Sequence, residues 1–403
     1  MSLLGAASLG WLLVEVWRVT WHQAQLDFSV YVLGAHHLVD GRLYAVSLTT
    51  VPHLPFTYPP VAALAFAPLT VLPTSAGQLL WATLNVLSLY AVLLLSLRAT
   101  LPGTDRVRLA LWALVLLGPS YLLDPIRLTF YFGQVNLVLC ALLLLDLTTE
   151  VRIARRTLPR GVLVGVAAAV KLVPLVFVPY LFVTRQVRAA WTALASFGAC
   201  SLVALAVHPS ASWDYWTRYA TDAARVGNPY YFLNQSLLGA ADRLTHRDLS
   251  PTAGDVVGLV VLVAGIALAR WAWRDSSAFL GILMCATTGM VVSPITWEHH
   301  LVWTVPVLVW LACASDRPPL GRLWAAATAV VLWWAPLQGV PTGGTLELHE
   351  HGWTLVAGNS FTALLVIFLG GVAVLLAVRG RSDRRAGAVS ARRSPAPSTA
   401  ATT

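Results

Sequence analysis

Lys171 is the residue whose type and position most clearly indicate chemistry. It is the only lysine among 27 basic side chains, and it lies inside the apolar run of residues 161–183. An ionisable group at membrane depth is costly and usually faces a cavity, and lysine presents a compact point charge where arginine presents a planar fork. We therefore expect Lys171 to bind an anion, most simply a phosphate. The alternative is a lysine whose charged end reaches the nearest membrane interface.

Other polar side chains are concentrated in short segments between apolar runs. They include carboxylates, imidazoles, amides and a further cation, and they occur at Asp27, His36 and His37, in LPFTYPP (54–60), at Asp124 and Arg127, and in FGQVN (132–136), FLNQS (232–236) and SPITWEHH (293–300). When the chain is threaded through a membrane, all of these fall at helix ends or in loops on one side. This pattern predicts a polar cavity beside lipid, which suits a substrate with a polar head and a long apolar tail.

The composition is typical of a protein that crosses a membrane many times. Apolar residues make up 57% of the chain and charged residues 11%, and stretches of about 20 apolar residues recur along its length. The formal net charge of +9 does not indicate nucleic-acid binding, because the arginines occur in short clusters between apolar runs rather than as one patch. By the positive-inside rule, these clusters are cytoplasmic.

The apolar runs and arginine clusters predict an all-α polytopic membrane protein with about 12 transmembrane helices and both termini inside. A first helix over residues 1–17 precedes a long extracytoplasmic loop over residues 20–58. Further helices are expected at residues 78–97, 109–125, 136–149, 189–207, 253–269, 277–294, 300–314, 322–336 and 355–378. Residues 1–380 are expected to form a single transmembrane domain, and residues 381–403 a disordered cytoplasmic tail.

Two segments need a separate interpretation. Residues 161–183 have arginines next to both ends, so we expect two short helices that meet near Lys171 and Pro174, with the lysine near the outer surface. Such a break is tolerated where irregular backbone lines a protein cavity. Residues 59–73 form a short apolar segment interrupted by Pro68, which we expect to be re-entrant rather than a crossing.

Six of the segments together resemble glycosyltransferase family 87. They are LDFSVYVLGAHHL, LPFTYPPVAAL, DPIRLTFYFGQVN, AVKLVPL, FLNQSLLGA and SPITWEHHLVW, and they follow one another from about residue 26 to about residue 304. The resemblance is greatest to the actinobacterial polyprenol-phosphate-mannose-dependent α-1,2-mannosyltransferases. It implies a GT-C fold in the plasma membrane, with the active site on the extracytoplasmic side. It also implies inverting transfer of mannose from polyprenyl-phosphate-mannose to a mannosyl hydroxyl of a glycolipid of the phosphatidylinositol mannoside or lipomannan type, without a nucleotide sugar. We expect no cofactor and assign no metal-binding residues.

The resemblance also implies catalytic residues. Asp27 matches the aspartate that the family uses as the base for the acceptor hydroxyl, and the alternative is a solvated loop carboxylate or a helix cap. His299 is expected to contact the donor phosphate or the acceptor sugar. With His300 it would bind a metal ion only if a third ligand were correctly placed. Glu298 is expected near the acceptor, where it either holds an imidazole protonated or alters the choice of acceptor.

Charge and hydrogen-bonding capacity suggest the remaining site residues. Lys171, Arg127 and His300 are expected to hold the leaving phosphate, whose charge grows in the transition state. The amides carry both donors and acceptors, which suits sugar hydroxyls, and Tyr58 is expected to stack on a sugar face; the amides are Gln134, Asn136, Asn234 and Gln235. For Asn136 the alternative is a hydrogen bond between helices.

Two other functions remain open at this point. A transporter would also combine apolar helices, prolines and a buried lysine, but it should show two halves with matching broken segments, and no internal repeat is found. The resembled family also includes arabinofuranosyltransferases that use decaprenyl-phospho-arabinose. The motifs do not distinguish mannose from arabinose as the donor sugar.

Overall fold

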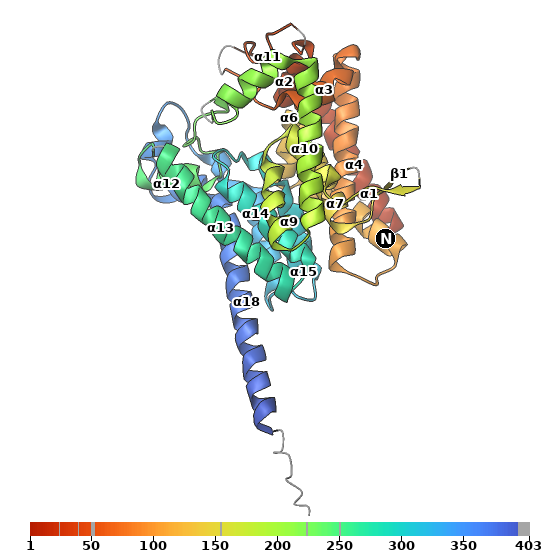
Figure 1. Ribbon diagram of the computed structural model, residues 1–403, viewed down its shortest axis with the longest axis vertical. Helices are drawn as coiled ribbons and strands as arrows, with labels where there is room; N and C mark the ends of the chain where they lie inside the picture. Colours follow the sequence, from red (N-terminus) through yellow and green to blue (C-terminus); the bar gives the residue numbers. More distant parts are fainter. Residues whose placement is uncertain are drawn as a thin grey trace, which may run out of the picture.

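Helices make up most of the described chain. The computed structural model describes residues 1–393 apart from 24, 39, 50–52, 154, 223–224 and 250, with side chains for all of these except 251–253 and 382–393. The helices pack side by side, and α18 (Ser360–Arg393) extends beyond the lower end of the body (Figure 1). The prediction of an all-helical architecture is therefore confirmed in its main part, and these helices position the polar segments.

The described residues of the first half form seven α-helices, one 3-10 helix and a small hairpin. They are α1 (Ser2–His22), α2 (Leu26–His36), α3 (Pro60–Phe66), η1 (Ala67–Val71), α4 (Thr74–Thr100), α5 (Arg106–Tyr121), α6 (Asp124–Phe132), α7 (Asn136–Thr148), β1 (Arg152–Ile153) and β2 (Arg156–Thr157). The two strands pair antiparallel, with Arg152 opposite Thr157. In this half α1 packs on α5, and α4 packs on α5 and α7.

The second half continues with helices of very different length. They are α8 (Val162–Val170), η2 (Val173–Val176), α9 (Phe177–Val183), α10 (Val187–Val207), α11 (Pro209–Asp214), η3 (Tyr215–Tyr219), α12 (Leu237–Thr245), α13 (Pro251–Asp275), α14 (Ala278–Val292), η5 (Glu298–Trp303), α15 (Thr304–Cys313), α16 (Gly321–Trp334), η6 (Pro336–Gly339), η7 (Leu346–His349), α17 (Gly352–Gly358) and α18. The main packing pairs are α8 with α10 and α13 with α14.

The prediction that residues 161–183 form two short helices that meet near Lys171 is confirmed. Lys171 has extended backbone (φ −150°, ψ 128°) and separates α8 from η2 and α9. Gly165 explains how closely α8 lies against α10, because a Cβ there would come within 2.3 Å of the Ala193 carbonyl oxygen. The segment therefore places a lysine at a break between two short helices.

The predicted helix at 109–125 is not continuous. Helix α5 ends at Tyr121, and α6 follows at an angle of 80°. Leu123 has extended backbone (ψ 127°), and Pro125 in the first turn of α6 has no N–H with which to continue α5. The bend carries α6 across the bundle, where it packs against η5 and α2.

Residues 20–58, which we predicted to be a long loop, contain a helix. This helix is α2, and Asp27 lies in its first turn. Gln25 precedes it in the left-handed region (φ 42°). The polar segment therefore has a folded part that fixes the orientation of Asp27.

Five helices of the described chain are long and apolar enough to cross a membrane, or six if α5 and α6 are one span. The five are Ser2–His22, Thr74–Thr100, Val187–Val207, Gly254–Asp275 and Ser360–Arg381, and four shorter apolar segments are Pro60–Val71, Asn136–Thr148, Val173–Val183 and Ala278–Val292. The count of about 12 crossings is not confirmed, since a span needs about 20 residues. At the C-terminus, α18 continues past residue 381 to Arg393, and the rest of the predicted tail, 394–403, lies outside the described residues.

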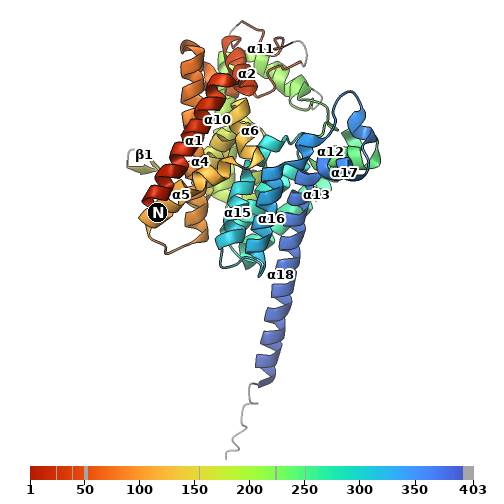
Figure 2. The ribbon, with the colours of Figure 1, turned by 180° about the vertical axis from the view of Figure 1, so that it is seen from behind.

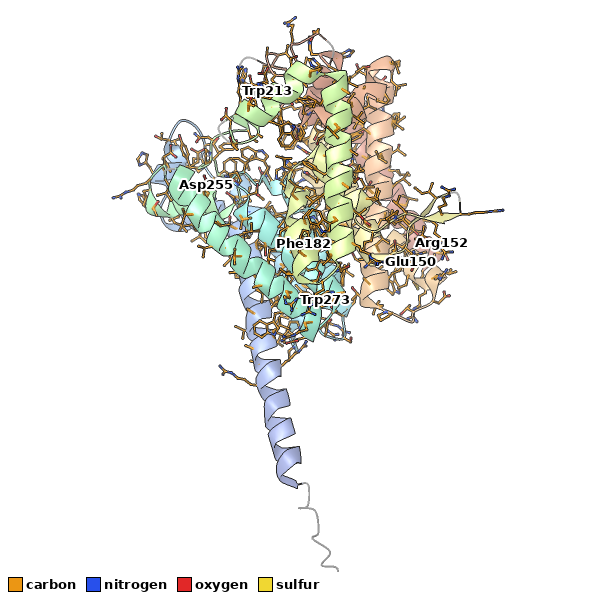
Figure 3. All side chains as sticks on the ribbon, viewed as in Figure 1. Glu150, Arg152, Phe182, Trp213, Asp255 and Trp273 are labelled. Carbon is orange, nitrogen blue, oxygen red and sulfur yellow. The ribbon has the colours of Figure 1, made fainter. Side chains whose placement is uncertain are left out.

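The connecting segments gather at two opposite ends of the body. At the lower end, Ser276 donates to the carboxylate of Asp316 (2.7 Å), and Arg379 donates to its carbonyl (2.9 Å). At the upper end, Arg225 donates to the Tyr44 carbonyl oxygen, which joins the segment after α11 to the loop after α2. Figure 3 shows Trp213 at the upper end and Trp273 towards the lower end.

Candidate active site

Asp27 is held by an amide from the turn between α6 and α7. Gln134 donates from Nε2 to Oδ2 of Asp27 at 2.7 Å, and Tyr31, one turn further along α2, donates to Gln134 Oε1 at 2.9 Å. Gly133 makes this approach possible, because it ends α6 in the left-handed region (φ 69°) and a Cβ there would lie 2.7 Å from Cβ of Phe28. The glycine before the amide therefore positions it against the carboxylate.

Lys171 is anchored by two polar side chains of the predicted site. Its Nζ donates to Asn136 Oδ1 at 2.8 Å and lies 3.0 Å from Nε2 of His300. The ammonium also lies over the Tyr58 ring, 5.6 Å from its centroid, where the ring face attracts a cation. Since a lysine has only donors, Nε2 of His300 accepts and leaves its ring neutral. Lys171 therefore points into the protein rather than toward an interface.

Asp27 and Lys171 belong to one connected row of hydrogen bonds. Asn136 bonds to Gln134 Oε1 (3.4 Å) and to the His299 carbonyl oxygen (3.0 Å), so the order is Asp27, Gln134, Asn136, Lys171 and His300. Residues far apart in sequence thus form one polar surface. Two tyrosines complete it, since the hydroxyl of Tyr31 lies 3.3 Å from that of Tyr58 and their rings meet edge to face at 5.2 Å.

Burial affects the acidity of Asp27. The carboxyl lies in α2, outside the helices long enough to span a membrane, and burial raises its pKa to about 6, while the Gln134 hydrogen bond and the Lys171 charge act in the opposite direction. A base with a pKa near the working pH combines a useful ionised fraction with enough basicity to take a proton. Asp27 therefore has the position and the acidity of a general base.

An apolar pocket begins at Lys171 and His300. Its polar lining comes from Asn136, Lys171, Thr296 and His300, and its other lining residues are Leu139, Cys140, Leu143, Val173, Pro174, Val176, Phe177, Ala286, Met290, Val302 and Trp303. This pairing of a cation with an apolar cavity fits a lipid that carries a phosphate at its end. The side chains come from α7, the break at 171–177, α14 and η5.

Glu298 and His299 are buried without side-chain partners. Glu298 is 1% exposed and His299 is 6% exposed, and among the described residues neither Glu298 Oε2 nor either ring nitrogen of His299 has a hydrogen-bond partner. Burial raises the pKa of Glu298 well above its usual value and lowers that of His299 well below it. The idea that Glu298 holds this imidazole protonated is therefore wrong, and both groups have their hydrogen-bonding capacity left for a ligand.

The local structure explains where these two residues lie. The N–H of Glu298 donates to the Leu233 carbonyl (3.1 Å), and Asn234 and Trp297 form an isolated β-bridge. The ring of His299 contacts that of Phe132 edge to face, with centroids 5.5 Å apart. The segment 229–236 thus supports the chain just before η5, and η5 packs on α6.

Asn234 and Gln235 are used in the fold rather than at the site. Both are fully buried. Asn234 donates to the carbonyls of Pro229 (2.7 Å) and Pro294 (3.0 Å), and its oxygen accepts from Thr296 N–H (2.8 Å). Gln235 donates to the carbonyls of Phe232 and Gly358, and its oxygen accepts from Phe361, Thr362 N–H and Thr362 Oγ1. Their predicted contact with sugar hydroxyls is corrected accordingly, because their amides join loops to one another.

Arg127 does not join Lys171. It donates from Nη2 to Asp124 Oδ1 at 2.5 Å, the carboxylate is fully buried, and the arginine side chain is 46% exposed. Gln338 donates to the other oxygen of Asp124 at 3.4 Å. Of the three residues predicted to hold the phosphate, Lys171 and His300 lie together, whereas Arg127 lies in a different part of the site.

One supporting residue had no signal in the sequence. Arg243 is 1% exposed and donates to the carbonyls of Tyr231 (3.0 Å) and Asn234 (3.0 Å) and to Asn359 Oδ1 (3.0 Å). It follows no motif, and it stands in a polar stretch where an arginine is ordinarily solvated. Separately, in the part of the chain that the structure describes, no three His, Cys, Asp or Glu residues are grouped so that they could hold a metal ion.

Comparisons with known proteins identify the family of the chain. The model of glycosyltransferase family 87 matches residues 56–294. A polyprenol-phosphate-mannose-dependent alpha-(1-2)-phosphatidylinositol mannoside mannosyltransferase of Mycobacterium tuberculosis is 34% identical over 393 residues, which covers 92% of this chain and 90% of the relative. The protein of the same description from Mycolicibacterium smegmatis is 32% identical and covers 90% and 85%. A pentamannoside mannosyltransferase of M. tuberculosis is 35% identical over 324 residues, 77% of this chain and 72% of that protein. No solved structure matches.

Proposed function

The chain belongs to glycosyltransferase family 87, and from this premise we propose that it transfers mannose from polyprenyl-phosphate-mannose to a mannosyl hydroxyl of a glycolipid. The acceptor is of the phosphatidylinositol mannoside or lipomannan type, the new linkage is α-1,2, and the configuration at the anomeric carbon is inverted. Two relatives that cover most of the chain are named as polyprenol-phosphate-mannose-dependent alpha-(1-2)-phosphatidylinositol mannoside mannosyltransferases. The donor sugar and the acceptor are therefore proposed from these relatives, and the residue roles from the geometry.

The observation that carries the proposal is the row from Asp27 to Lys171. Asp27 takes the proton of the acceptor hydroxyl while the acceptor oxygen bonds to the anomeric carbon. The bond from that carbon to the phosphate oxygen breaks, and a polyprenyl phosphate leaves. Gln134 Nε2 fixes the orientation of the carboxylate at 2.7 Å, which aligns it for proton transfer.

The leaving phosphate belongs at Lys171 and His300. A phosphodiester becomes a phosphomonoester as the bond breaks, so its negative charge increases, and a fixed cation stabilises the transition state more than the ground state. The ammonium of Lys171 supplies that charge. Asn136 and Tyr58 hold it in place from two sides.

The apolar pocket behind Lys171 is proposed for the first prenyl units of the donor. Its lining from Val173 to Phe177 and from α14 is apolar, so it offers a prenyl chain the burial of apolar surface. The space available is about 50 Å³, enough for only a few water molecules. Donor binding therefore requires the side chains of the pocket to move apart.

We place the active site on the outer face of the plasma membrane because the arginine-containing turns near Arg270, Arg317 and Arg379 share the opposite end of the body. Positive clusters favour the cytoplasm. Cysteine-accessibility labelling tests this arrangement: positions 30–49 and 210–222 should react with an impermeant reagent from outside, and positions 98–108 only from within. Outside labelling of 98–108 would reverse the assignment.

A lipid-donor assay tests the function itself. The purified chain in nanodiscs is given labelled mannosyl or arabinosyl polyprenyl phosphate with a mannosylated phosphatidylinositol. We expect label in the lipid from the mannosyl donor alone, released by an enzyme specific for α-1,2-linked mannose. Transfer from the arabinosyl donor instead would identify an arabinofuranosyltransferase, and movement of intact donor across a bilayer without transfer would indicate transport.

A further inference from the structure

A second cavity lies at the upper ends of α16 and α17, away from Lys171. It has a volume of about 360 Å³, several times that of the pocket behind the lysine. Figure 2 shows the top of α16 and α17 on the side of the body from which α18 descends. The cavity is lined by Trp334, Ala335, Pro336, Gln338, Gly339, Val340, Trp353, Thr354 and Ala357.

Two stacked tryptophans form one wall of this cavity. The rings of Trp334 and Trp353 have centroids 5.6 Å apart and an interplanar angle of 25°, and each residue is 58% exposed. Indole rings present a large apolar face and a single N–H donor, which suits the C–H face and the hydroxyls of a sugar ring. Neighbouring Trp333 is equally exposed at 58% but does not line the cavity, so it has the surroundings of a residue that faces lipid.

Polar contacts lead from this cavity to the start of α6, the helix whose other end precedes Gln134. Gln338 lines the cavity and donates to Asp124 at 3.4 Å, and Asp124 pairs with Arg127. These two residues lie in the first turns of α6, and Gln134 follows the other end of the same helix. From Asp124 to Phe132 the helix rises about 12 Å, which is longer than one hexose. Glu298 and His299, with their unpaired groups, lie on η5, which packs along α6.

We propose that this cavity binds an inner sugar of the glycolipid acceptor, while the terminal sugar reaches Asp27. The proposal rests on the proposed function, because it assigns the acceptor a path at the same active site. The free face of one ring in the Trp334–Trp353 stack packs on the inner sugar, and the second ring supports the first. The half-exposed Arg127, with Glu298 and His299, offers hydrogen bonds to hydroxyls along α6. The geometry selects acceptors that carry several sugars, since a lipid with a single sugar cannot occupy both the cavity and the base.

Steady-state kinetics with two acceptors test this assignment. The full chain in nanodiscs is given polyprenyl-phosphate-mannose with either a phosphatidylinositol that carries several mannoses or octyl α-mannoside. Trp334→Ala and Trp353→Ala should each raise KM for the larger acceptor about tenfold, with KM for the donor and turnover of octyl α-mannoside unchanged. Trp333→Ala is the matched control and should leave all three values unchanged. Trp353→Phe should restore part of the affinity, because the ring face is kept.

Two outcomes would overturn the proposal. In one, both cavity variants behave like Trp333→Ala. In the other, the folded Trp353→Phe protein and the alanine variants lose turnover with both acceptors equally. A direct measurement of acceptor binding distinguishes failure of this proposal from failure of the proposed function. Native mass spectrometry should find the multiply mannosylated lipid retained by the original chain and lost by Trp353→Ala, whether or not mannose is transferred. Equal loss of plain phosphatidylinositol would show an interfacial lipid contact and also refute the sugar site.

Discussion

Gln134 donates its amide N–H to the carboxylate of Asp27 at 2.7 Å, although 107 positions separate the two residues. This contact joins the helix after α1 to the turn between α6 and α7, and it leaves the second carboxylate oxygen for an acceptor hydroxyl. Within the part of the chain that the structure describes, Gln134 is the side chain that bonds to this carboxylate. This arrangement is what a general base requires, since its orientation is fixed while its lone pair stays accessible.

Asp27→Asn should abolish transfer while the protein still folds. The amide keeps the shape of the side chain but cannot take a proton, so turnover should fall about 10²–10⁴-fold. The rate is measured with the mannosyl donor in nanodiscs, beside thermal unfolding and donor binding. Turnover of the folded Asp27→Asn protein near the original level would disprove the role of base.

The pH dependence should show opposite effects on activity and stability. Because burial raises the pKa of Asp27 to about 6, the base is protonated below that pH, and turnover should fall about tenfold per pH unit there. The folded state holds this proton more tightly than the unfolded chain, whose carboxyl has a pKa of about 3.9. Asp27 therefore contributes stability that increases as the pH falls from about 6 to about 4 and is lost as the pH rises through 6.

A control separates Asp27 from the other buried carboxyl near it. Glu298 also has a raised pKa, and Glu298→Gln removes its titration. The acid limb near pH 6 should persist in Glu298→Gln when log turnover is plotted against pH. If that limb disappears, Glu298 rather than Asp27 is the titrating group.

Substitution of Lys171 should affect the donor. Lys171→Ala should lower turnover about 10²-fold, by analogy with the loss of one group that stabilises a developing charge, and should weaken donor binding. Lys171→Arg should restore activity only in part, because a planar guanidinium does not fit between Asn136 and His300, which lie 2.8 and 3.0 Å from Nζ. Donor KM and turnover are measured for both variants, with thermal unfolding as a check on folding.

The outcome that contradicts this prediction is full activity of a folded Lys171→Ala protein with unchanged donor affinity. If Lys171→Ala is less stable than the original protein, the cause would be a carboxylate that has lost a nearby positive charge. Asp124 pairs with Arg127, so Lys171 is not its ion-pair partner, whereas the charges of Lys171 and Asp27 attract each other. The double variant Asp27→Asn/Lys171→Ala should therefore unfold at a higher temperature than Lys171→Ala alone.

The sequence indicated that Asp27 and Lys171 belong to one polar region, but it did not predict the structure that supports them. A lone lysine in an apolar run and a carboxylate after the first helix are unusual enough to stand out, and both join the same row. The helix α2 was missed because its polar surroundings indicated a loop. The 80° bend before α6 was missed because Pro125 at a helix start is also compatible with a straight continuation of the apolar run.

Residue type alone does not predict which of the four amide side chains lie at the site and which bind backbone groups. Gln134 and Asn136 face Asp27 and Lys171, whereas Asn234 and Gln235 bind backbone groups of their own and neighbouring loops. All four have the same donors and acceptors, so only the path of the backbone decides which ones remain free for a ligand. The path of the backbone also explains why Arg127 does not join Lys171. It places the arginine beside the carboxylate of Asp124, three residues away on α6.

Asn234→Ala should destabilise the protein rather than weaken sugar binding. The substitution leaves the N–H groups of Thr296 and Ser236 and the carbonyl of Pro229 without the hydrogen bonds that Asn234 makes to them, at about 1–3 kcal/mol for each group. The melting temperature in detergent should therefore fall by several degrees, and the fraction that stays folded should keep its acceptor KM. Asn228→Ala, an exposed position in the same segment, is the control and should leave the melting temperature unchanged. A normal melting temperature for Asn234→Ala together with a raised acceptor KM would show that this amide binds the sugar after all. A group that binds only the substrate contributes nothing to the free energy of unfolding.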